Sequence, residues 1–322
     1  MADTLAVVIT SYSLERQQDV CDALTSLAHQ EEPADEILFV AEGPPELQRA
    51  IEAHAAAFRL RGFRALRNEG GQGLSAARNV ATNATGADLI AFLDDDAVAE
   101  PGWSAAIRAA FAGDETAIGV TGPVQPLWMD GSADWLPMEL YWLISCTGFT
   151  GWSARRQVRG AWGVNMAFRR RAFETAGLFS TEAGYTAGAR HQPWSDDLEF
   201  SLRARRATGG TIWFEPGMIV RHKVHPYRVS PRFTAARARQ VGASQHLARR
   251  VYPEFAHDRF ETSVGLRIVG MVLRSLAVFP LHPLRSQRRV RIGTIALVNA
   301  LLGFVSPSTA MASAPAPTLK DR

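Results

Sequence analysis

The sequence predicts an α/β fold: a mostly parallel, doubly wound sheet with flanking helices, followed by a helical extension rich in basic and apolar residues. Strand and helix patterns alternate through the first third of the 322-residue chain. Nearly half of the residues are hydrophobic, which is enough for a large buried core. Residues 1–220 hold 18 basic and 28 acidic side chains, whereas residues 221–322 hold 17 basic and 4 acidic ones. An acidic body with a basic arm points to contact between the arm and phosphate groups.

The predicted elements of the first third follow from local patterns. The apolar run LAVVIT (5–10) reads as a buried strand, and Val20, Leu24 and Leu27 share one face of a helix over 16–29. A strand EILFVA follows, closed by Gly43, Pro44 and Pro45, and then a helix from Glu46 and a strand FRAL (63–66). The next helix begins at Leu74, with Ser75 as its expected N-cap and Gly86 as its stop. A strand DLIAFL (88–93) comes after it.

Polar residues follow three of these strands. They are Ser11 and Tyr12, Glu42, and the run Asp94 to Asp96. Ligands of doubly wound sheets bind beyond the carboxyl ends of the strands. The sequence therefore predicts a ligand site at this edge of the sheet.

The three consecutive aspartates pose an electrostatic problem. Two unit charges about 4 Å apart repel by about 1 kcal/mol in water and about 4 kcal/mol at an effective dielectric near 20. In an extended segment, Asp94 and Asp96 would point to one side and Asp95 to the other. A divalent cation, Mg²⁺ or Mn²⁺, would relieve the repulsion, since such ions are held by one or two carboxylates plus substrate phosphates. The alternative is a solvated turn in which one aspartate caps a helix at Pro101.

A second acidic cluster opens the helix expected over residues 194–210. Ser195 is the expected cap, Asp196, Asp197 and Glu199 occupy the first turn, and Gly209 ends the helix. The helix dipole alone favours acids in a first turn. A carboxylate at this place is also where a general base could deprotonate an acceptor hydroxyl.

Seven segments, in this order, resemble the inverting family 2 glycosyltransferases of the GT-A fold. They cover nearly all of residues 5–225 and read VVITSYS, FVAEG, NEGGQGLSAARN, FLDDDAVAEPGW, GVNMAFRRRAFETAGLF, SDDLEFSLRARRATGG and FEPGMIVRH. The resemblance implies a Rossmann-like, nucleotide-diphospho-sugar transferase fold. It also implies transfer of a sugar from a nucleotide sugar to a hydroxyl of a glycan or lipid-linked acceptor, in a single displacement with inversion and with Mg²⁺ or Mn²⁺ as cofactor.

The resemblance also assigns roles to residues. Asp197 is implied as the catalytic base and Asp196 as its neighbour. Asn165 is implied as a contact of the acceptor sugar. Asp96 is implied as the acid that coordinates the metal, with Asp94 near the metal and the ribose. His222 is implied to face the metal or the diphosphate, and a surface histidine after a strand is the open alternative. The implied nucleotide-sugar site consists of Ser11, Tyr12, Glu42, Arg78, Asn79, Asp94 and Asp95.

Three segments qualify the match. The family usually has an aspartate in an element VDDGS, where this chain reads VAEGP with Ala41 and Glu42, so the identity of the nucleotide stays open. The usual Glu-Asp pair is here Asp196 and Asp197. The stretch LPMELYWLISC (136–146) resembles a subgroup that includes transferases acting on polyprenyl phosphate-linked sugars.

The C-terminal part is predicted to be helical. The boundaries expected are a catalytic domain over 1–225, a basic helical segment over 226–262, amphipathic and apolar helices over 263–305, and a disordered tail over 306–322. In 264–281 the only charged residues are Arg267 and Arg274, which share one face. The apolar run 292–305 is short for a span of about 20 residues.

Two interpretations of this basic arm are open. The helices lie on the cytoplasmic face of a membrane, with arginines on anionic headgroups, or they pack on protein. The first places the enzyme at the membrane periphery beside a lipid-linked acceptor. Nucleic acid is not an expected partner, because no zinc signature or known reading motif is present.

Other features bear on compartment and class. Cys21 and Cys146 are too few for a disulfide framework and fit a reducing compartment, and MADTLAVVITSYS lacks the pattern of a signal peptide, so we expect a cytoplasmic enzyme. A nucleotidyltransferase is an alternative, but ITSYSLERQQD lacks the glycines of its activating loop. A non-catalytic scaffold with the same fold is a second alternative. The presence of both acidic clusters argues against it.

Overall fold

The computed structural model describes residues 3–69, 73–183, 194–255 and 260–307. The chain divides into two compact units. Unit 1 comprises residues 1–125, 153–187 and 196–222, and unit 2 comprises residues 126–152, 188–195 and 223–322. The tail expected to be disordered lies, from residue 308 onward, outside the described residues.

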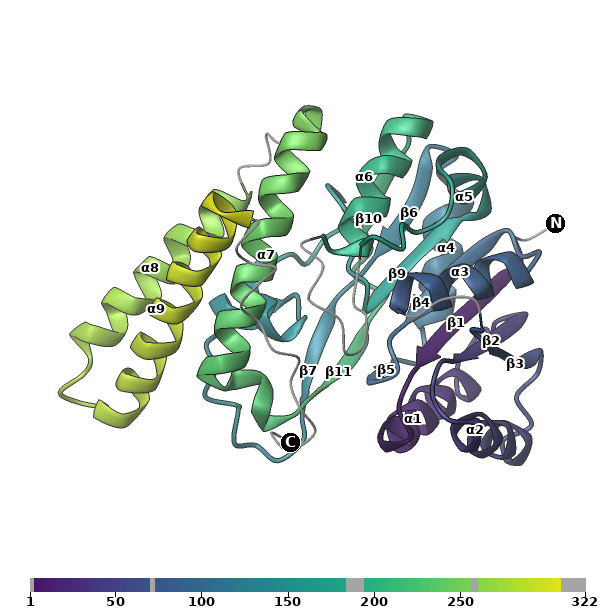
Figure 1. Cartoon of the computed structure of the whole chain (residues 1–322), viewed down its shortest axis with the longest axis horizontal. Coiled ribbons are helices and arrows are strands. Elements are labelled where there is room, and N and C mark those ends of the chain that lie inside the picture. Colours follow the sequence, from purple (N-terminus) through teal and green to yellow (C-terminus); the bar gives the residue numbers. More distant parts are fainter. Residues whose placement is uncertain (1–2, 70–72, 184–193, 256–259, 308–322) are drawn as a thin grey trace. The chain divides into compact units, whose positions relative to one another are not determined.

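Unit 1 is built on an eight-stranded mixed sheet in the order β3-β2-β1-β4-β9-β6-β10-β8 (Figure 1). The pairs β1–β2, β2–β3, β1–β4 and β6–β10 are parallel, whereas β9 runs antiparallel to both β4 and β6, and β8 antiparallel to β10. The strands are β1 Leu5–Ser11, β2 Glu36–Ala41, β3 Phe63–Arg67, β4 Leu89–Leu93, β6 Ala117–Thr121, β8 Arg156–Val158, β9 Asn165–Arg169 and β10 Thr211–Phe214. This mixed α/β architecture confirms the predicted fold class.

Buried apolar runs explain the centre of this sheet. Every residue of β4 is buried, as is every residue of β2 after Glu36, which is expected of strands covered on both faces. The helices of unit 1 are α1 Gln17–Ala28, preceded by a 3-10 turn at Leu14–Arg16, α2 Pro45–Ala57, α3 Leu74–Ala84, α4 Trp103–Ala112, α5 Arg170–Ala176 and α6 Asp196–Thr208. Helix α3 packs on β1, β2 and β3, and α5 and α6 pack on each other and on β6.

An aromatic cluster fixes α6 against the sheet. The rings of Phe173 and Phe200 stack with centroids 4.5 Å apart, and Phe168 meets Phe200 edge to face at 4.9 Å. Phe179 lies 4.6 Å from Phe200 and 5.3 Å from Phe92 of β4. Such contacts add to the stability gained from burial of the rings. They hold the start of α6 close to the end of β4, where the two acidic clusters lie.

Several predicted boundaries differ from the structure. Helix α3 has Gly73, not Ser75, at its N-cap, because Gly73 adopts a φ of +114° that suits glycine. Strand β4 ends at Leu93 as predicted, but Asp94 to Asp96 form a turn and not an extended segment before the short strand β5, Ala97–Ala99. Helix α4 begins at Trp103 with Gly102 as N-cap and no side-chain cap. The alternative in which an aspartate of this run caps the helix is therefore wrong.

Strand β5 gains its partner from the end of unit 1. It pairs antiparallel with β11, Val220–Val224, so that His222 lies opposite Ala97. This pairing is what brings His222 to the aspartate turn. Strand β7, Val124–Trp128, leads from unit 1 into unit 2.

Unit 2 is mainly helical. Its long helices are α7 Pro231–Val251, α8 Phe260–Ala277 and α9 Pro283–Val305, with short 3-10 helices at Met138–Ile144, Gly148–Thr150, Pro226–Val229 and Pro253–Phe255. Glycines permit the close packing of α7 on α9: a Cβ on Gly242 would lie 2.0 Å from the carbonyl oxygen of Ala300, and one on Gly303 would lie 2.0 Å from that of Arg239. Helix α9 begins nine positions before the apolar run predicted from Ile292, so it includes the arginines that precede that run.

Among the described residues, no helix combines the length and the apolar character that crossing a bilayer requires.

Candidate active site

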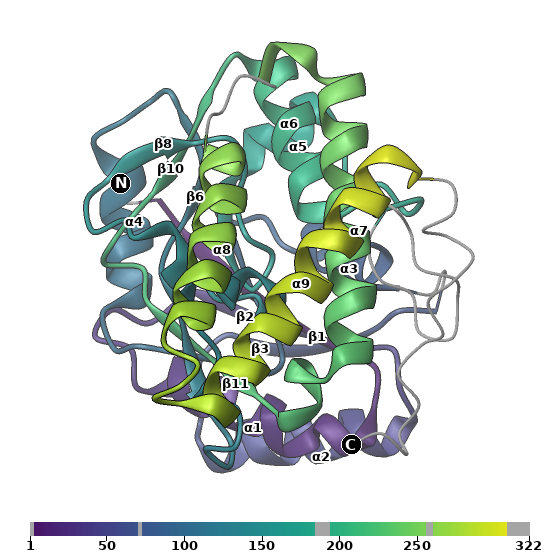
Figure 2. The same ribbon diagram turned by 90° about the vertical axis from the view of Figure 1, so that its left-hand side faces the viewer.

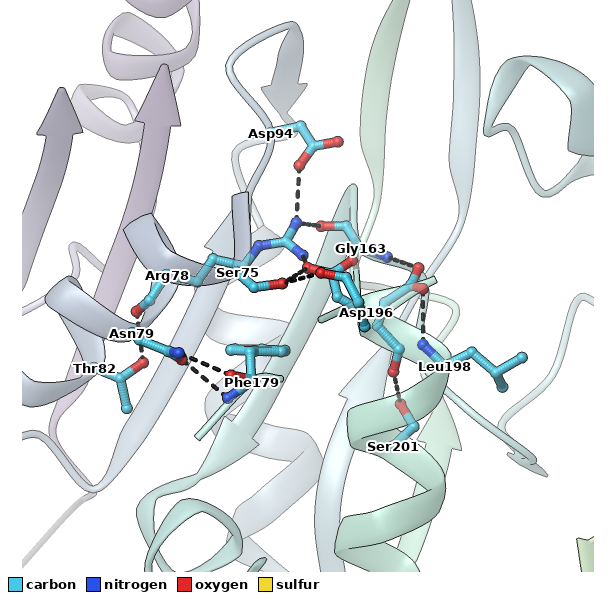
Figure 3. Close-up of polar contacts among 12 residues, drawn as sticks. Ser75, Arg78, Asn79, Thr82, Asp94, Gly163, Phe179, Asp196, Leu198 and Ser201 are labelled. Carbon is cyan, nitrogen blue, oxygen red and sulfur yellow. Dashed lines mark hydrogen bonds and ion pairs between the residues drawn. The ribbon is translucent and has the colours of Figure 1, made fainter. Parts of the chain in front are cut away.

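Arg78 of α3 joins the two acidic clusters of unit 1 (Figure 3). Its Nη1 atom donates to Oδ2 of Asp196 at 2.7 Å, and its Nη2 atom donates to Oδ1 of Asp94 at 3.2 Å and to the carbonyl oxygen of Gly163 at 3.1 Å. The side chain is 2% exposed, and its guanidinium lies 5.7 Å from the ring centroids of both Phe92 and Phe179. Burial alone would lower the pKa of Arg78, but the attraction of Asp196, Asp94 and Asp197 outweighs burial and raises it.

The two aspartates that open α6 have different surroundings. Asp196 is buried, and its Oδ2 accepts hydrogen bonds from Arg78 and, at 3.4 Å, from the hydroxyl of Ser75. Asp197 is partly exposed; its Oδ2 accepts from the backbone N–H of Gly163 at 2.8 Å and its Oδ1 from that of Leu198 at 2.7 Å. Burial, and then the charge of Asp196, raise the pKa of Asp197 above its usual value. Of the pair, Asp197 has the exposure and the pKa direction of a general base.

Gly163 connects Arg78 to Asp197. Its carbonyl accepts from Arg78 and its N–H donates to Asp197. A Cβ at this position would lie 3.2 Å from both Arg78 Nη2 and Asp197 Oδ2, which is tighter than ordinary van der Waals contact. A glycine therefore lets the three groups approach one another.

The turn after β4 forms a second buried charge cluster. Asp95 accepts from the hydroxyl of Ser11 at 2.7 Å and also from Arg16, which lies 3.5 Å from Oδ2 of Asp96. Asp96 Oδ1 lies 3.1 Å from Nε2 of His222, and both side chains are almost completely buried. The expectation from strand alternation that Asp95 points away from Asp96 is wrong, because both contact Arg16 and the segment is a turn.

Burial dominates the electrostatics of this turn. It raises the pKa of Asp94, an effect that Arg78 partly offsets and the charge of Asp96 strengthens. It raises the pKa of Asp95 to about 7, although Arg16 and Ser11 act in the opposite direction. Three carboxyl groups, of which Asp95 and Asp96 are buried and Asp94 is partly exposed, thus share a region with an unfavourable excess of negative charge, which a bound cation would relieve.

The donor set fits a divalent cation that takes part of its coordination from a substrate. Asp96 and His222 offer an oxygen and a nitrogen on one side, whereas Asp94 is turned toward Arg78. Across the described parts of the chain, no three His, Cys, Asp or Glu side chains form a preassembled metal site. Mg²⁺ and Mn²⁺ commonly use one or two carboxylates, with diphosphate oxygens and water completing the shell. Of the three residues expected near a metal, Asp96 and His222 therefore lie next to each other, whereas Asp94 contacts Arg78.

Three other expected nucleotide-site residues lie at the predicted edge of the sheet. Ser11 ends β1, and the ring of Tyr12 lies 5.5 Å from the guanidinium carbon of Arg16. Glu42 follows β2, and its carboxylate accepts from the side chain of Asn68 and from the N–H of Gly73 at 3.0 Å. The end of the sheet thus gathers these positions as the strand pattern predicts.

Two expected ligand contacts have structural partners instead. The amide of Asn79 makes two hydrogen bonds to the backbone of Phe179, at 2.8 and 2.9 Å. Asn165 has 0% exposure; its Oδ1 accepts from Trp103 Nε1 at 2.8 Å and its Nδ2 donates to the carbonyl of Met218 at 2.7 Å. The expected contact of Asn165 with an acceptor sugar does not fit this burial, because the side chain has no accessible atom.

Sequence reasoning missed Arg16, Ser75 and Gly163. Arg16 has a signal, since it is the first basic residue after the polar end of β1. Ser75 is expected as a cap, whereas its hydroxyl donates to the carbonyl of Ala183 at 2.9 Å and lies 3.4 Å from Oδ2 of Asp196. Gly163 stands two positions before β9, and its role depends on a contact with α3 that no local pattern encodes.

Known proteins resemble this chain, one in sequence and others in fold. A curated relative from Haloferax volcanii, described as glucosyl-dolichyl phosphate glucuronosyltransferase, is 26% identical over 280 residues, which are 84% of this chain and 85% of the relative. The mannosyltransferase PcManGT from Pyrobaculum calidifontis, solved with GDP-Man and Mn²⁺, superposes with a TM-score of 0.65 at 15% identity over 96% of this chain and 88% of its own. GalNAc-T7, solved with UDP, GalNAc and Mn²⁺, gives a TM-score of 0.52 at 17% identity over 70% of this chain and 44% of its own.

The family assignment rests on more than half of the chain. Residues 6–177, which include the end of β1, Arg78, the aspartate turn and Gly163, match the sequence model of the family described as Glycosyl transferase family 2. The two structural neighbours share its α/β fold. The chain therefore belongs to glycosyl transferase family 2 and is a glycosyltransferase.

Proposed function

We propose that this enzyme transfers a sugar from a nucleoside-diphosphate sugar to a hydroxyl group of a lipid-linked saccharide, in a single displacement that inverts the anomeric carbon. The observation that carries the proposal is the arrangement around Arg78. One guanidinium holds Asp94 of the β4 turn and Asp196 of α6, and Asp197 stands next to it with its carboxylate partly exposed. A donor-side and an acceptor-side acid are thereby kept at a fixed separation.

The donor end of the site would be the turn after β4. Asp96 and His222 would hold Mn²⁺ or Mg²⁺. When bound, the ion supplies positive charge to the diphosphate leaving group. Ser11 and Arg16 restrain Asp95, and Tyr12 and Glu42 lie at neighbouring strand ends where the nucleoside would bind. The structural neighbours solved with GDP-Man or UDP and with Mn²⁺ support this class of donor.

The acceptor end would be the start of α6. Asp197 would accept the proton of the acceptor hydroxyl as its oxygen attacks the anomeric carbon, and the raised pKa makes this carboxylate a stronger base. The N–H groups of Gly163 and Leu198 hold the carboxylate in place. Asp196, bound to Arg78, would position Asp197 and would not itself take the proton. No covalent sugar intermediate is needed.

We infer the acceptor class from the Haloferax volcanii relative, and the cellular location from that acceptor and from the cysteines of this chain. The relative acts on a glucosyl-dolichyl phosphate, which supports a polyprenyl phosphate-linked sugar as acceptor. Such an acceptor would bring the enzyme to the surface of a membrane. Cys21 and Cys146 are buried and form no disulfide, which supports a reducing compartment and hence the cytoplasmic face.

The proposal is tested by screening purified full-length protein with Mn²⁺ against sugar nucleotides, including UDP-glucuronate and GDP-mannose, with polyprenyl phosphate glycosides as acceptors. We expect transfer from at least one donor, with the product's anomeric configuration inverted by NMR. Asp197→Asn should lower kcat by about 10²- to 10⁴-fold while donor binding is kept. Glu46→Gln, an exposed acid in the first turn of α2, is the matched control and should keep full activity. Full activity of Asp197→Asn, or a retained configuration, would contradict the mechanism.

A further inference from the structure

Helix α8 of unit 2 carries an apolar stripe on its exposed face. Leu266, Val269, Leu273 and Leu276 are spaced by three, four and three positions, which places them on one side of a helix. Leu266 is 68% exposed and Leu273 is 60% exposed. The opposite side of the helix is already buried, through Ile268, Met271 and Ser275. The exposed stripe is therefore additional to the face with which α8 packs in unit 2.

The apolar surface continues around the turn into α9. Val278, Phe279, Leu281 and Leu284 are all exposed, Leu281 by 75% and Leu284 by 76%. Further along α9, Val298, Leu301, Leu302 and Val305 form a second exposed stripe with helical spacing. Helices α8 and α9 lie side by side, as Figure 2 shows. So many exposed apolar side chains on two neighbouring helices and the turn between them are unusual for a monomeric protein and mark an interaction surface.

Arginines border this surface and acids are absent from it. Residues 264–305 contain six arginines and no aspartate or glutamate. Arg267 and Arg274 flank the α8 stripe, and Arg285, Arg288, Arg289 and Arg291 occupy the first half of α9. Arg274 pairs with Glu139 at 2.7 Å. Among the described residues no ion pair is present for the four arginines of α9. Arg285, Arg288 and Arg291 are exposed, whereas Arg289 is half-buried.

We propose that the outer face of α8, the 278–284 turn and α9 is a docking surface for an anionic lipid bilayer. The leucines and Phe279 enter the headgroup boundary, and the arginines contact lipid phosphates, as in interfacial amphipathic helices. The charge pattern selects this occupant. A second copy of the chain would bring a basic face against the same basic face, which is unfavourable. The inference deepens the acceptor class of the proposed function, but lipid binding is measured without any catalysis.

The test is flotation of full-length protein with phosphatidylcholine vesicles, prepared with or without phosphatidylglycerol, at low and at high salt. We expect the wild type to float with the anionic vesicles and to be released in part by salt. Phe279→Ser combined with Leu281→Ser should weaken binding by about tenfold or more, since exposed apolar side chains are lost without opening a core. Arg285→Gln combined with Arg288→Gln should remove the preference for phosphatidylglycerol and the sensitivity to salt.

Phe58→Ser is the matched control, because Phe58 of unit 1 is as exposed as Phe279, 43% against 44%. It should float like the wild type, and circular dichroism should show all variants folded. Wild-type protein that stays unbound from anionic vesicles, or serine variants that bind as well as wild type, would overturn the proposal. So would a dimer by light scattering that the Phe279→Ser, Leu281→Ser variant converts to a monomer without altered vesicle binding.

If vesicle binding is found but no donor is turned over, the docking surface stands and the proposed reaction fails. The reverse result would leave the reaction in place and remove the docking surface.

Discussion

The guanidinium of Arg78 donates to Asp196 at 2.7 Å across 118 positions of sequence, and the same group donates to Asp94. Both ends of the candidate active site therefore depend on one buried cation. The resemblance implied that Arg78 contacts the nucleotide, whereas the structure engages both of its Nη atoms with protein. We propose that Arg78 is a positioning residue rather than a ligand of the diphosphate.

Arg78→Met should destabilise the fold. It leaves the carboxylates of Asp196 and Asp94 without their cation, and loss of one partner of a buried ion pair costs about 3–5 kcal/mol of unfolding free energy. Adding Asp196→Asn to Arg78→Met should recover part of this loss, because one orphaned charge is removed. Urea unfolding of the wild type, both single variants and the double variant gives the coupling energy. Strictly additive changes in unfolding free energy would contradict a direct interaction between Arg78 and Asp196.

Arg78→Lys separates positioning from charge. A lysine keeps the positive charge but lacks the planar fork that reaches Asp94 and Asp196 together. We expect a smaller loss of stability than in Arg78→Met, with kcat reduced and the KM of the donor almost unchanged. A large rise in donor KM would instead indicate that Arg78 binds the diphosphate directly.

The raised pKa of Asp197 sets the acid limb of the pH profile. A general base works only when deprotonated, so activity is lost as pH falls through its pKa, and here the loss begins at a higher pH than for an ordinary aspartate. Asp196→Asn removes the like charge that is the second cause of the shift, so the limb should move to lower pH. The measurement is kcat/KM against pH for wild type and Asp196→Asn. An unmoved acid limb would contradict Asp197 as the base.

The sequence predicted the features that depend on local patterns. Buried apolar runs gave β1, β2 and β4, and the polar residues after them placed the site at the correct sheet edge. It could not predict that Asp94, Asp95 and Asp96 contact different partners. Strand alternation failed because β4 ends at Leu93, and the partners of Asp94, Asp95 and Asp96 come from α3, the start of α1 and β11. These partners meet only through tertiary packing.

The motif positions show the same limit. Asn165 opens a strand in a segment typical of the family, but its neighbours along the chain do not reveal that Trp103 and Met218 enclose it. The sequence does not reveal the role of Gly163, because that role depends on the absence of a Cβ beside Arg78 and Asp197. Roles that depend on what a distant helix brings to a residue need the structure.

Removal of divalent cations should abolish transfer. The carboxyl groups of the turn after β4 would repel a diphosphate unless a bound cation offset their negative charge. Activity lost in EDTA should return with Mn²⁺. Asp96→Asn should raise the Mn²⁺ concentration needed for half-maximal activity by about tenfold or more, and His222→Gln should do likewise. Glu46→Gln serves again as control. Undiminished activity in EDTA would exclude a metal-dependent mechanism.

Asn165→Ala should act on stability and not on acceptor binding. The substitution leaves the indole N–H of Trp103 and the carbonyl of Met218 buried without partners, and each orphaned group costs about 1–3 kcal/mol. We therefore expect a lower urea midpoint, with the acceptor KM of the folded fraction unchanged at low temperature. Asn165→Asp is the informative companion, since it keeps the acceptor for Trp103 but places a carboxylate against the carbonyl of Met218, and it should be less stable than wild type. If Asn165→Ala keeps full stability and raises the acceptor KM, the side chain contacts the acceptor after all, and the start of β9 must move when substrate binds.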